Sequence, residues 1–124
     1  EEFRMAILLI THDLGVVAEC AERVVVMYAG LVVESAPVRE LFERPLHPYT
    51  QGLLASLPRL SGSKRGQRLP AIPGMVPDLL RLPAGCKFAP RCGYVLDRCR
   101  AADPELRDMG SGRWVRCIRA EEFL

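Results

Sequence analysis

The chain has 124 residues, of which 17 are Lys or Arg and 15 are Asp or Glu, so its formal net charge is +2. This near balance excludes a histone-like polycation, and the 49% apolar and 26% charged residues are typical of a folded domain. The longest apolar stretch, residues 24–33, has 10 residues, whereas about 20 are needed to cross a bilayer. The chain starts with neither Met nor a secretory signal, so we expect it to be part of a longer protein.

The first predicted elements are a strand and a helix. The continuous apolar run Met5–Thr11 (MAILLIT) predicts a strand buried on both faces. Apolar residues then recur three and four positions apart after Asp13, which predicts a helix whose first N–H groups are capped by the Asp13 carboxylate. Cys20 falls beside the apolar face of that helix, where we expect a buried and inert thiol.

A hairpin and two short helices are predicted next. The β-branched segments Arg23–Tyr28 and Leu31–Glu34 are separated by an Ala-Gly turn, which favours two antiparallel strands. Pro37 and Pro48 both suit a first helical turn, and apolar residues follow each of them at helical spacing. His47 precedes the second of these helices, so we expect it to cap the helix and to carry no chemistry.

Composition changes after residue 60. Residues 1–58 hold 4 basic and 8 acidic side chains, whereas residues 59–119 hold 13 basic and 5 acidic. The segment SGSKRG at positions 61–66 has no apolar residue and predicts a linker, and the prolines that follow it predict an irregular arm without long helices. We therefore predict three parts, residues 1–60, 61–85 and 86–124.

Four of the five cysteines lie in the last part, at Cys86, Cys92, Cys99 and Cys117. Their spacing, C-x5-C-x6-C-x17-C, lacks the C-x2-C pair that is usual in zinc ribbons. Four thiolates can instead hold a [4Fe–4S] cluster, whose larger body tolerates ligands from separate loops. An iron–sulfur cluster, a zinc ion, and disulfides or free thiols are the three alternatives that this pattern leaves open.

Several motifs resemble one family of proteins. The sequence ILLITHDLGVV, followed by RVVVMYAG, is similar to the end of an ABC-transporter nucleotide-binding domain, where a strand delivers the switch-loop histidine. The later motifs HPYT, IPG and GCKFAPRC resemble the carboxy-terminal extension of oligopeptide and dipeptide importer ATPase subunits. The resemblance covers nearly the whole chain. It implies an α/β fold, namely a partial ABC-type nucleotide-binding domain followed by an irregular Cys-rich extension.

The resemblance also implies residue roles. His12 would be the switch histidine that contacts the γ-phosphate of ATP in the intact parent, and the four late cysteines would be ligands of a [4Fe–4S] cluster. The chain has no G-x-x-x-x-G-K-[ST] phosphate loop, no signature sequence and no catalytic carboxylate at a strand end. We therefore expect ATP and Mg²⁺ to bind only the intact parent, an ATPase, and the fragment alone to be inactive.

An assembly is implied as well. The parent would lie peripherally at the cytoplasmic face of the cell membrane, bound to transmembrane permease subunits and paired with a second ATPase subunit, and would drive peptide import. No nucleic acid partner is expected. We expect the isolated fragment to self-associate, because the strand Met5–Thr11 lacks neighbours; a clean monomer in light scattering would contradict this.

Two functions from other classes remain open at this stage. One is a small basic module that binds zinc through the four cysteines and contacts nucleic acid through its basic second half. The other is an iron–sulfur sensing module that acts on the transporter.

Overall fold

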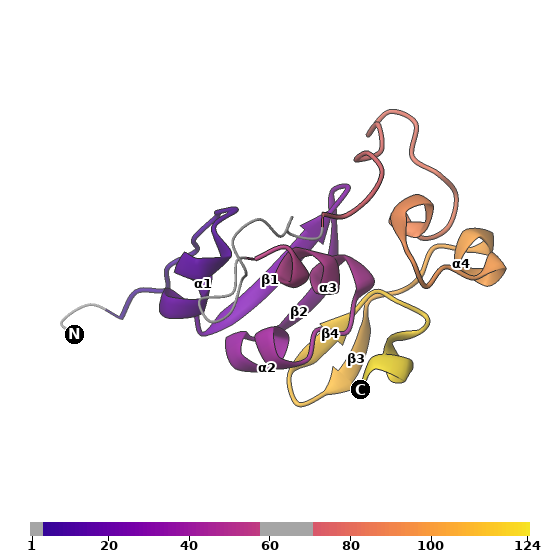
Figure 1. Ribbon diagram of the computed structural model, residues 1–124. Helices are drawn as coiled ribbons and strands as arrows, with labels where there is room; N and C mark the ends of the chain where they lie inside the picture. The colour runs from indigo at the N-terminus through magenta and orange to yellow at the C-terminus, as the bar shows by residue number, and fades with distance from the viewer. Residues whose placement is uncertain (1–3, 58–70) are drawn as a thin grey trace, which may run out of the picture.

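The structure is a computed structural model that describes residues 4–57 and 71–124. Four strands form one antiparallel sheet in the order β1-β2-β4-β3, and short helices lie around it (Figure 1). The helices are α1 (Leu14–Cys20), α2 (Val38–Glu43), α3 (Pro48–Ala55) and α4 (Asp97–Ala101), with 3-10 turns at Ala89–Arg91 and Ala120–Phe123. This mixed arrangement confirms the predicted α/β class.

The predicted hairpin is formed by β1 (Arg23–Tyr28) and β2 (Leu31–Pro37). Every second residue of β1 is buried, ending at Tyr28, so one face of the strand packs on the core. The turn places Ala29 at φ 50° and Gly30 at φ 79°. Two consecutive positive φ angles match the twist of antiparallel strands, and glycine adopts this conformation without strain.

A second hairpin comes from the end of the chain. It consists of β3 (Arg107–Gly110) and β4 (Arg113–Val115), and β4 pairs antiparallel with β2. Residues 113–115 therefore extend the sheet that residues 23–37 begin. The three-part division of the chain stays a prediction, and its first and last parts share this sheet.

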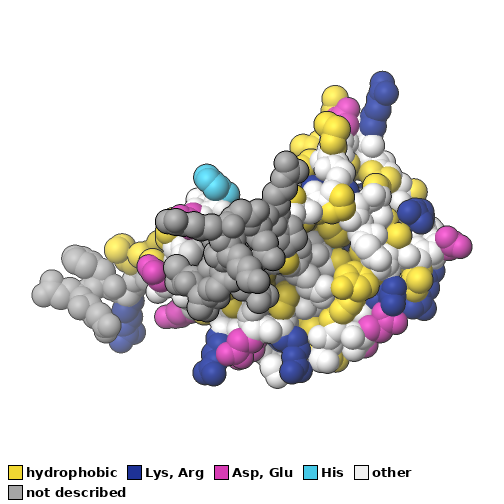
Figure 2. Space-filling view, viewed as in Figure 1, with side chains coloured by type: hydrophobic (Ala, Val, Ile, Leu, Met, Phe, Trp, Pro, Cys, Tyr) yellow, Lys and Arg dark blue, Asp and Glu magenta, His cyan; other side chains and the backbone are white. Residues whose placement is uncertain are grey.

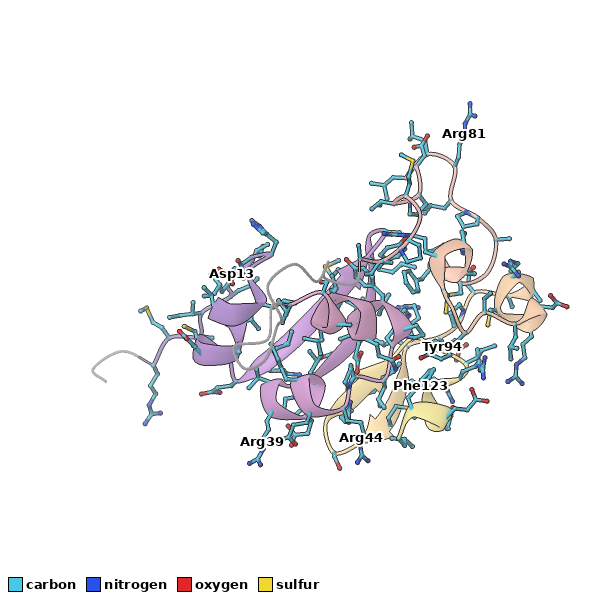
Figure 3. All side chains as sticks on the ribbon, viewed as in Figure 1. Asp13, Arg39, Arg44, Arg81, Tyr94 and Phe123 are labelled. Carbon is cyan, nitrogen blue, oxygen red and sulfur yellow. The ribbon has the colours of Figure 1, made fainter. Side chains whose placement is uncertain are left out.

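The predicted helix caps are confirmed. The Asp13 carboxylate accepts hydrogen bonds from the N–H groups of Gly15 at 3.0 Å and Val16 at 3.3 Å, and Figure 3 shows Asp13 at the start of α1. The N–H of Tyr49 donates to His47 Nδ1 at 3.0 Å. The expectation for Cys20 was wrong, because this thiol is exposed.

The strand predicted for Met5–Thr11 is absent. This segment pairs with none of the four strands, and its side chains point to solvent, with Ile7 85% and Ile10 89% exposed. A strand buried on both faces needs a paired neighbour and a covering layer. The described residues provide no paired strand and no covering layer for Met5–Thr11, because β1 is the outermost strand of their sheet.

The core joins both ends of the chain. Its larger cluster contains residues of β1, β2 and α2, including the fully buried Leu41, together with Phe88 from the extension. The Phe88 ring lies 5.2 Å from the Tyr28 ring and 5.5 Å from the Tyr49 ring. A smaller cluster contains Leu46, Val115 and Ala120.

Residues 71–85 form an irregular loop without a helix, as predicted. Arg91 fixes its start by donating to the carbonyls of Pro73 at 3.0 Å and Ile72 at 3.4 Å. Figure 3 shows Arg81 near the tip of this loop, and Figure 2 shows hydrophobic side chains at the same end of the molecule. The linker predicted at 61–66 lies outside the described residues.

Every helix within residues 4–57 and 71–124 is too short or too polar to reach across a bilayer.

Candidate functional site

The four late cysteines line one cavity in the extension. They arrive from four segments: Cys86 in a turn, Cys92 at the end of a 3-10 turn, Cys99 in α4, and Cys117 just after β4. The sequence analysis grouped these four cysteines as ligands of one site, and in the structure all four line the same cavity. The other lining residues are His47, Pro48, Phe88, Ala89, Tyr94, Val95, Ala102, Pro104, Ile118 and Arg119.

Gly85 allows two of the cysteine segments to meet. Its φ is +75°, and a Cβ at this position would lie 2.4 Å from the carbonyl oxygen of Cys99. The neighbouring Cys86 N–H donates to that same carbonyl oxygen at 2.7 Å. Any larger residue at position 85 would force the Cys86 turn away from α4.

Backbone N–H groups donate to the sulfurs of two of the four cysteines. The N–H of Tyr94 donates to Cys92 Sγ at 3.3 Å, and the N–H of Leu96 donates to Cys99 Sγ at 3.4 Å. Backbone N–H groups of residues that follow Cys86 and Cys117 also oppose the rise in the pKa of these two thiols. All four thiols are free and half-buried.

Burial keeps three of these thiols protonated. It raises the pKa of Cys86 and Cys92, and it raises the pKa of Cys117 to about 11, with the backbone hydrogen bonds opposing the shift in each case. The neighbouring cysteines add to the rise, because two thiolates in one cavity repel each other. At neutral pH these thiols are therefore poor nucleophiles.

The two basic side chains near Cys117, those of Arg116 and Arg119, make different contacts. Arg119 lines the cavity, and its charge lowers the pKa of Cys92 as a minor effect. Arg116 instead holds segments together, donating to the carbonyls of Val32 at 2.8 Å and Pro104 at 3.1 Å. Only part of the basic charge in this half of the sequence is thus directed at the sulfurs.

The comparison with known proteins identifies the family. Residues 33–99 match the family model described as the oligopeptide/dipeptide transporter, C-terminal region. The chain belongs to this family. The matched range includes His47 and three of the four cysteines, and it ends before Cys117.

Individual relatives agree with this assignment. The chain is 54% identical to a putative peptide import ATP-binding protein of Brucella ovis over 98% of its own length and 37% of the relative. It is 54% identical to the oligopeptide transport ATP-binding protein AppD of Bacillus subtilis over the same shares. It is 49% identical to the dipeptide transport ATP-binding protein DppD of Escherichia coli over 91% of the chain and 34% of the relative. The chain thus spans about a third of the length of these relatives.

A buried carboxylate that holds the backbone at His47, one of the cavity-lining residues, was not predicted. Glu34 on β2 is fully buried, and its carboxylate accepts the N–H groups of Leu46 at 2.7 Å and His47 at 3.0 Å. Arg113 on β4 lies 3.5 Å from the same carboxylate. The only signal in the sequence was a Glu within a run of strand-forming residues, which does not distinguish a buried carboxylate from an exposed one.

The structure does not bring His12 to the cysteines. His12 is exposed in the turn before α1, and Figure 1 shows α1 and α4 at opposite sides of the molecule. Within residues 4–57 and 71–124, no three His, Cys, Asp or Glu side chains stand close enough together to ligate one metal ion. The four sulfurs therefore surround a cavity rather than a single point.

Proposed function

We propose that this chain is the carboxy-terminal part of the ATP-hydrolysing, energy-coupling subunit of a peptide import system. The observation that carries the proposal is the match of residues 33–99 to the transporter family. The named import ATP-binding proteins, which align over more than 90% of the chain, support it. In that subunit, ATP and Mg²⁺ would be bound largely by residues that this chain lacks.

The same proposal covers the assembly. The subunit would lie at the cytoplasmic face of the membrane, bound to permease subunits and a second ATPase subunit. Self-association of the isolated fragment also stays a prediction. It is supported by the exposed apolar side chains of segment 5–10 and by the unpaired edge of β1 among the described strands.

His12 is the residue on which we test this proposal. In the full-length subunit, assembled with its permease in vesicles, we expect His12→Ala to lower ATP-driven peptide uptake about 100-fold, because a misplaced γ-phosphate contact costs that much. Asp13→Asn is the control, since Asn also caps helices and leaves the imidazole in place. Uptake at the wild-type rate in His12→Ala would contradict the proposed role.

We propose further that Cys86, Cys92, Cys99 and Cys117 hold a [4Fe–4S] cluster. The fit rests on the donor set: four free thiols line one cavity, backbone N–H groups donate to the sulfurs of Cys92 and Cys99, and Arg119 adds positive charge. When bound, such a cluster would link four chain segments and add a redox-active centre. The protein would contribute the sulfur ligands and the hydrogen bonds that tune them.

Zinc is the less favoured occupant. A tetrahedral zinc site needs all four sulfurs about 2.3 Å from one point, whereas no three potential ligands among the described residues meet around one ion. A zinc module that binds nucleic acid would also leave residues 1–58 without a role, while the transporter relatives align with almost the whole chain.

Metal analysis tests the cluster. We expect the anaerobically purified full-length subunit to contain about four iron and four sulfide per chain, with a broad absorption band near roughly 400 nm. Cys92→Ser should remove the band and make residues beyond about 80 sensitive to protease, because the irregular extension has little core of its own. Cys20→Ser, an exposed thiol outside the pocket, is the matched control.

The other outcomes are equally informative. One zinc per chain would replace the cluster with a structural zinc site. Neither metal, with unchanged protease resistance in Cys92→Ser, would reduce the four cysteines to thiols or disulfides. Reversible reduction of the cluster accompanied by changed transport would mark a sensing module instead of a structural one.

A further inference from the structure

We infer that the segment 86–92 couples the four-cysteine pocket to the loop 72–83, so that a group bound by the sulfurs also fixes the position of the exposed apolar tip of this loop. Lys87 and Arg91 are the positioning residues that make the connection. This coupling depends on the four-cysteine site proposed above, and it extends to a loop that the cavity-lining residues do not include.

Arg91 anchors the first end of the loop. Its Nε donates to the carbonyl of Pro73 at 3.0 Å, and its terminal nitrogens lie 3.4 Å from the carbonyl oxygen of Ile72 and from the hydroxyl of Tyr28. Gly74 permits this approach, because its φ is +85° and a Cβ there would lie 3.1 Å from Arg91 Cγ. The guanidinium thus joins the loop to the buried Tyr28 of β1.

Lys87 anchors the other end. Its Nζ donates to the carbonyl of Pro83 at 2.6 Å and to the Asp103 carboxylate at 3.2 Å. The Lys87 side chain is only 15% exposed, whereas that of Asp103 is 69% exposed. A largely buried ammonium needs acceptors, and hydrogen bonds from a charged donor are stronger than neutral ones. The contact between Lys87 and the Pro83 carbonyl therefore resists opening.

Both anchors are connected to the cysteines through a compact backbone. Lys87 directly follows Cys86, and Arg91 is the residue before Cys92. Between them, the Ala89 N–H donates to the Cys86 carbonyl at 3.1 Å. The Cys92 N–H in turn donates to the Ala89 carbonyl at 3.3 Å. Successive hydrogen-bonded turns restrict φ and ψ, so a displacement of the two sulfurs also displaces Lys87 and Arg91.

The tip between the two anchors is apolar and exposed. Met75 is 87% and Leu80 is 92% exposed. Within the tip, the Asp78 carboxylate accepts the N–H of Leu80 at 2.9 Å, and the Asp78 carbonyl accepts the N–H of Arg81 at 3.0 Å. The tip thus keeps a turn of its own. Because its large side chains are exposed rather than packed, its position depends on the two anchored ends.

Thermodynamic linkage makes this coupling measurable from either side. A group that binds Cys86 and Cys92 together restricts the segment between them, and with it both ends of the loop. Coupling is reciprocal, so releasing the loop from Lys87 must in turn weaken the binding of that group. Coupling free energies between sites correspond to changes in affinity of about 5- to 150-fold.

Lys87→Met tests the coupling, because Met keeps the length of the side chain but cannot donate to Pro83. In the anaerobically purified full-length subunit, we expect the iron-loaded variant to lose iron to a chelator about 10-fold faster than wild type. We also expect trypsin to cut about 10-fold faster after Arg81, which Figure 3 shows near the tip of the loop. Lys87→Arg, which keeps a charged donor, should bring both rates back towards wild type.

Arg98→Met is the matched control. It removes the same charge beside another cysteine, Cys99, but from an exposed position on α4. We expect iron loss and cleavage after Arg81 to stay at the wild-type rates. Iron loss as fast as in Lys87→Met would attribute the effect to charge alone and would overturn the coupling.

Two further results would contradict the proposal. One is a wild-type value of either rate in folded Lys87→Met; a change in cleavage alone would mean that Lys87 anchors the loop without any link to the sulfurs. The other, measured on wild type, is amide hydrogen exchange at residues 79–82 that is equal with and without iron, since coupling requires slower exchange when iron is bound.

The proposed cluster can fail separately. If the wild-type protein binds no iron, the coupling is measured from the alkylation of Cys86 and Cys92 by iodoacetamide, with the exposed Cys20 as the internal reference. We expect alkylation of these two thiols to be about 10-fold faster in Lys87→Met, and alkylation of Cys20 to be unchanged. Equal rates at Cys86 and Cys92 would then overturn the coupling as well.

Discussion

Replacing Glu34 with Ala is expected to lower the free energy of unfolding by about 3–5 kcal/mol. The carboxylate is fully buried, accepts two backbone N–H groups and faces Arg113 at 3.5 Å. Its removal leaves a buried guanidinium without its counter-charge and two N–H groups without their acceptor, and both losses are costly in a protein interior. Urea denaturation of the chain, followed by circular dichroism, measures the change.

The chain offers a matched control for this substitution. Glu43 also pairs with an arginine, Arg39, at 2.9 Å, but both side chains are largely exposed on α2, and Figure 3 shows Arg39 at the outer edge of the molecule. Water screens this pair, so Glu43→Ala should leave the urea midpoint unchanged. Equal effects of the two substitutions would show that Glu34 does not organise the segment at His47.

Replacing Phe88 with Ala is expected to cost about 3–5 kcal/mol and to loosen the packing of the segment around Phe88 against the sheet. Phe88 is 3% exposed and lies among the rings of Tyr28, Tyr49 and His47, which come from the first part of the chain. Removing the ring leaves a cavity at the contact between the two parts. Urea denaturation measures the loss, and limited proteolysis should show faster cleavage within residues 71–85.

Met75→Ala is the control for this second experiment. Met75 is 87% exposed in the same loop, so its truncation removes apolar surface without opening a cavity. Its stability and cleavage pattern should match those of wild type. A Phe88→Ala variant with wild-type cleavage would mean that the extension is held by the sheet pairing of β4 alone.

Local features could be predicted from the sequence. The β1-β2 hairpin follows from β-branched strands around a turn that suits positive φ. The Asp13 and His47 caps follow from side chains placed directly before helical patterns. Membership of the oligopeptide/dipeptide transporter family follows from short motifs in a fixed order, as the family match confirms. The hairpin, the caps and each single motif involve residues within a few positions of one another.

The sequence by itself thus determined the hairpin, the helix starts and the identity of the four cysteines as one set. The tertiary structure alone decided that β4 pairs with β2, that Phe88 enters the core and that Glu34 holds the segment at His47. It also decided that Met5–Thr11 is not a strand here. The physical reason is that sheet pairing and burial depend on partners distant in the chain, which local patterns do not specify.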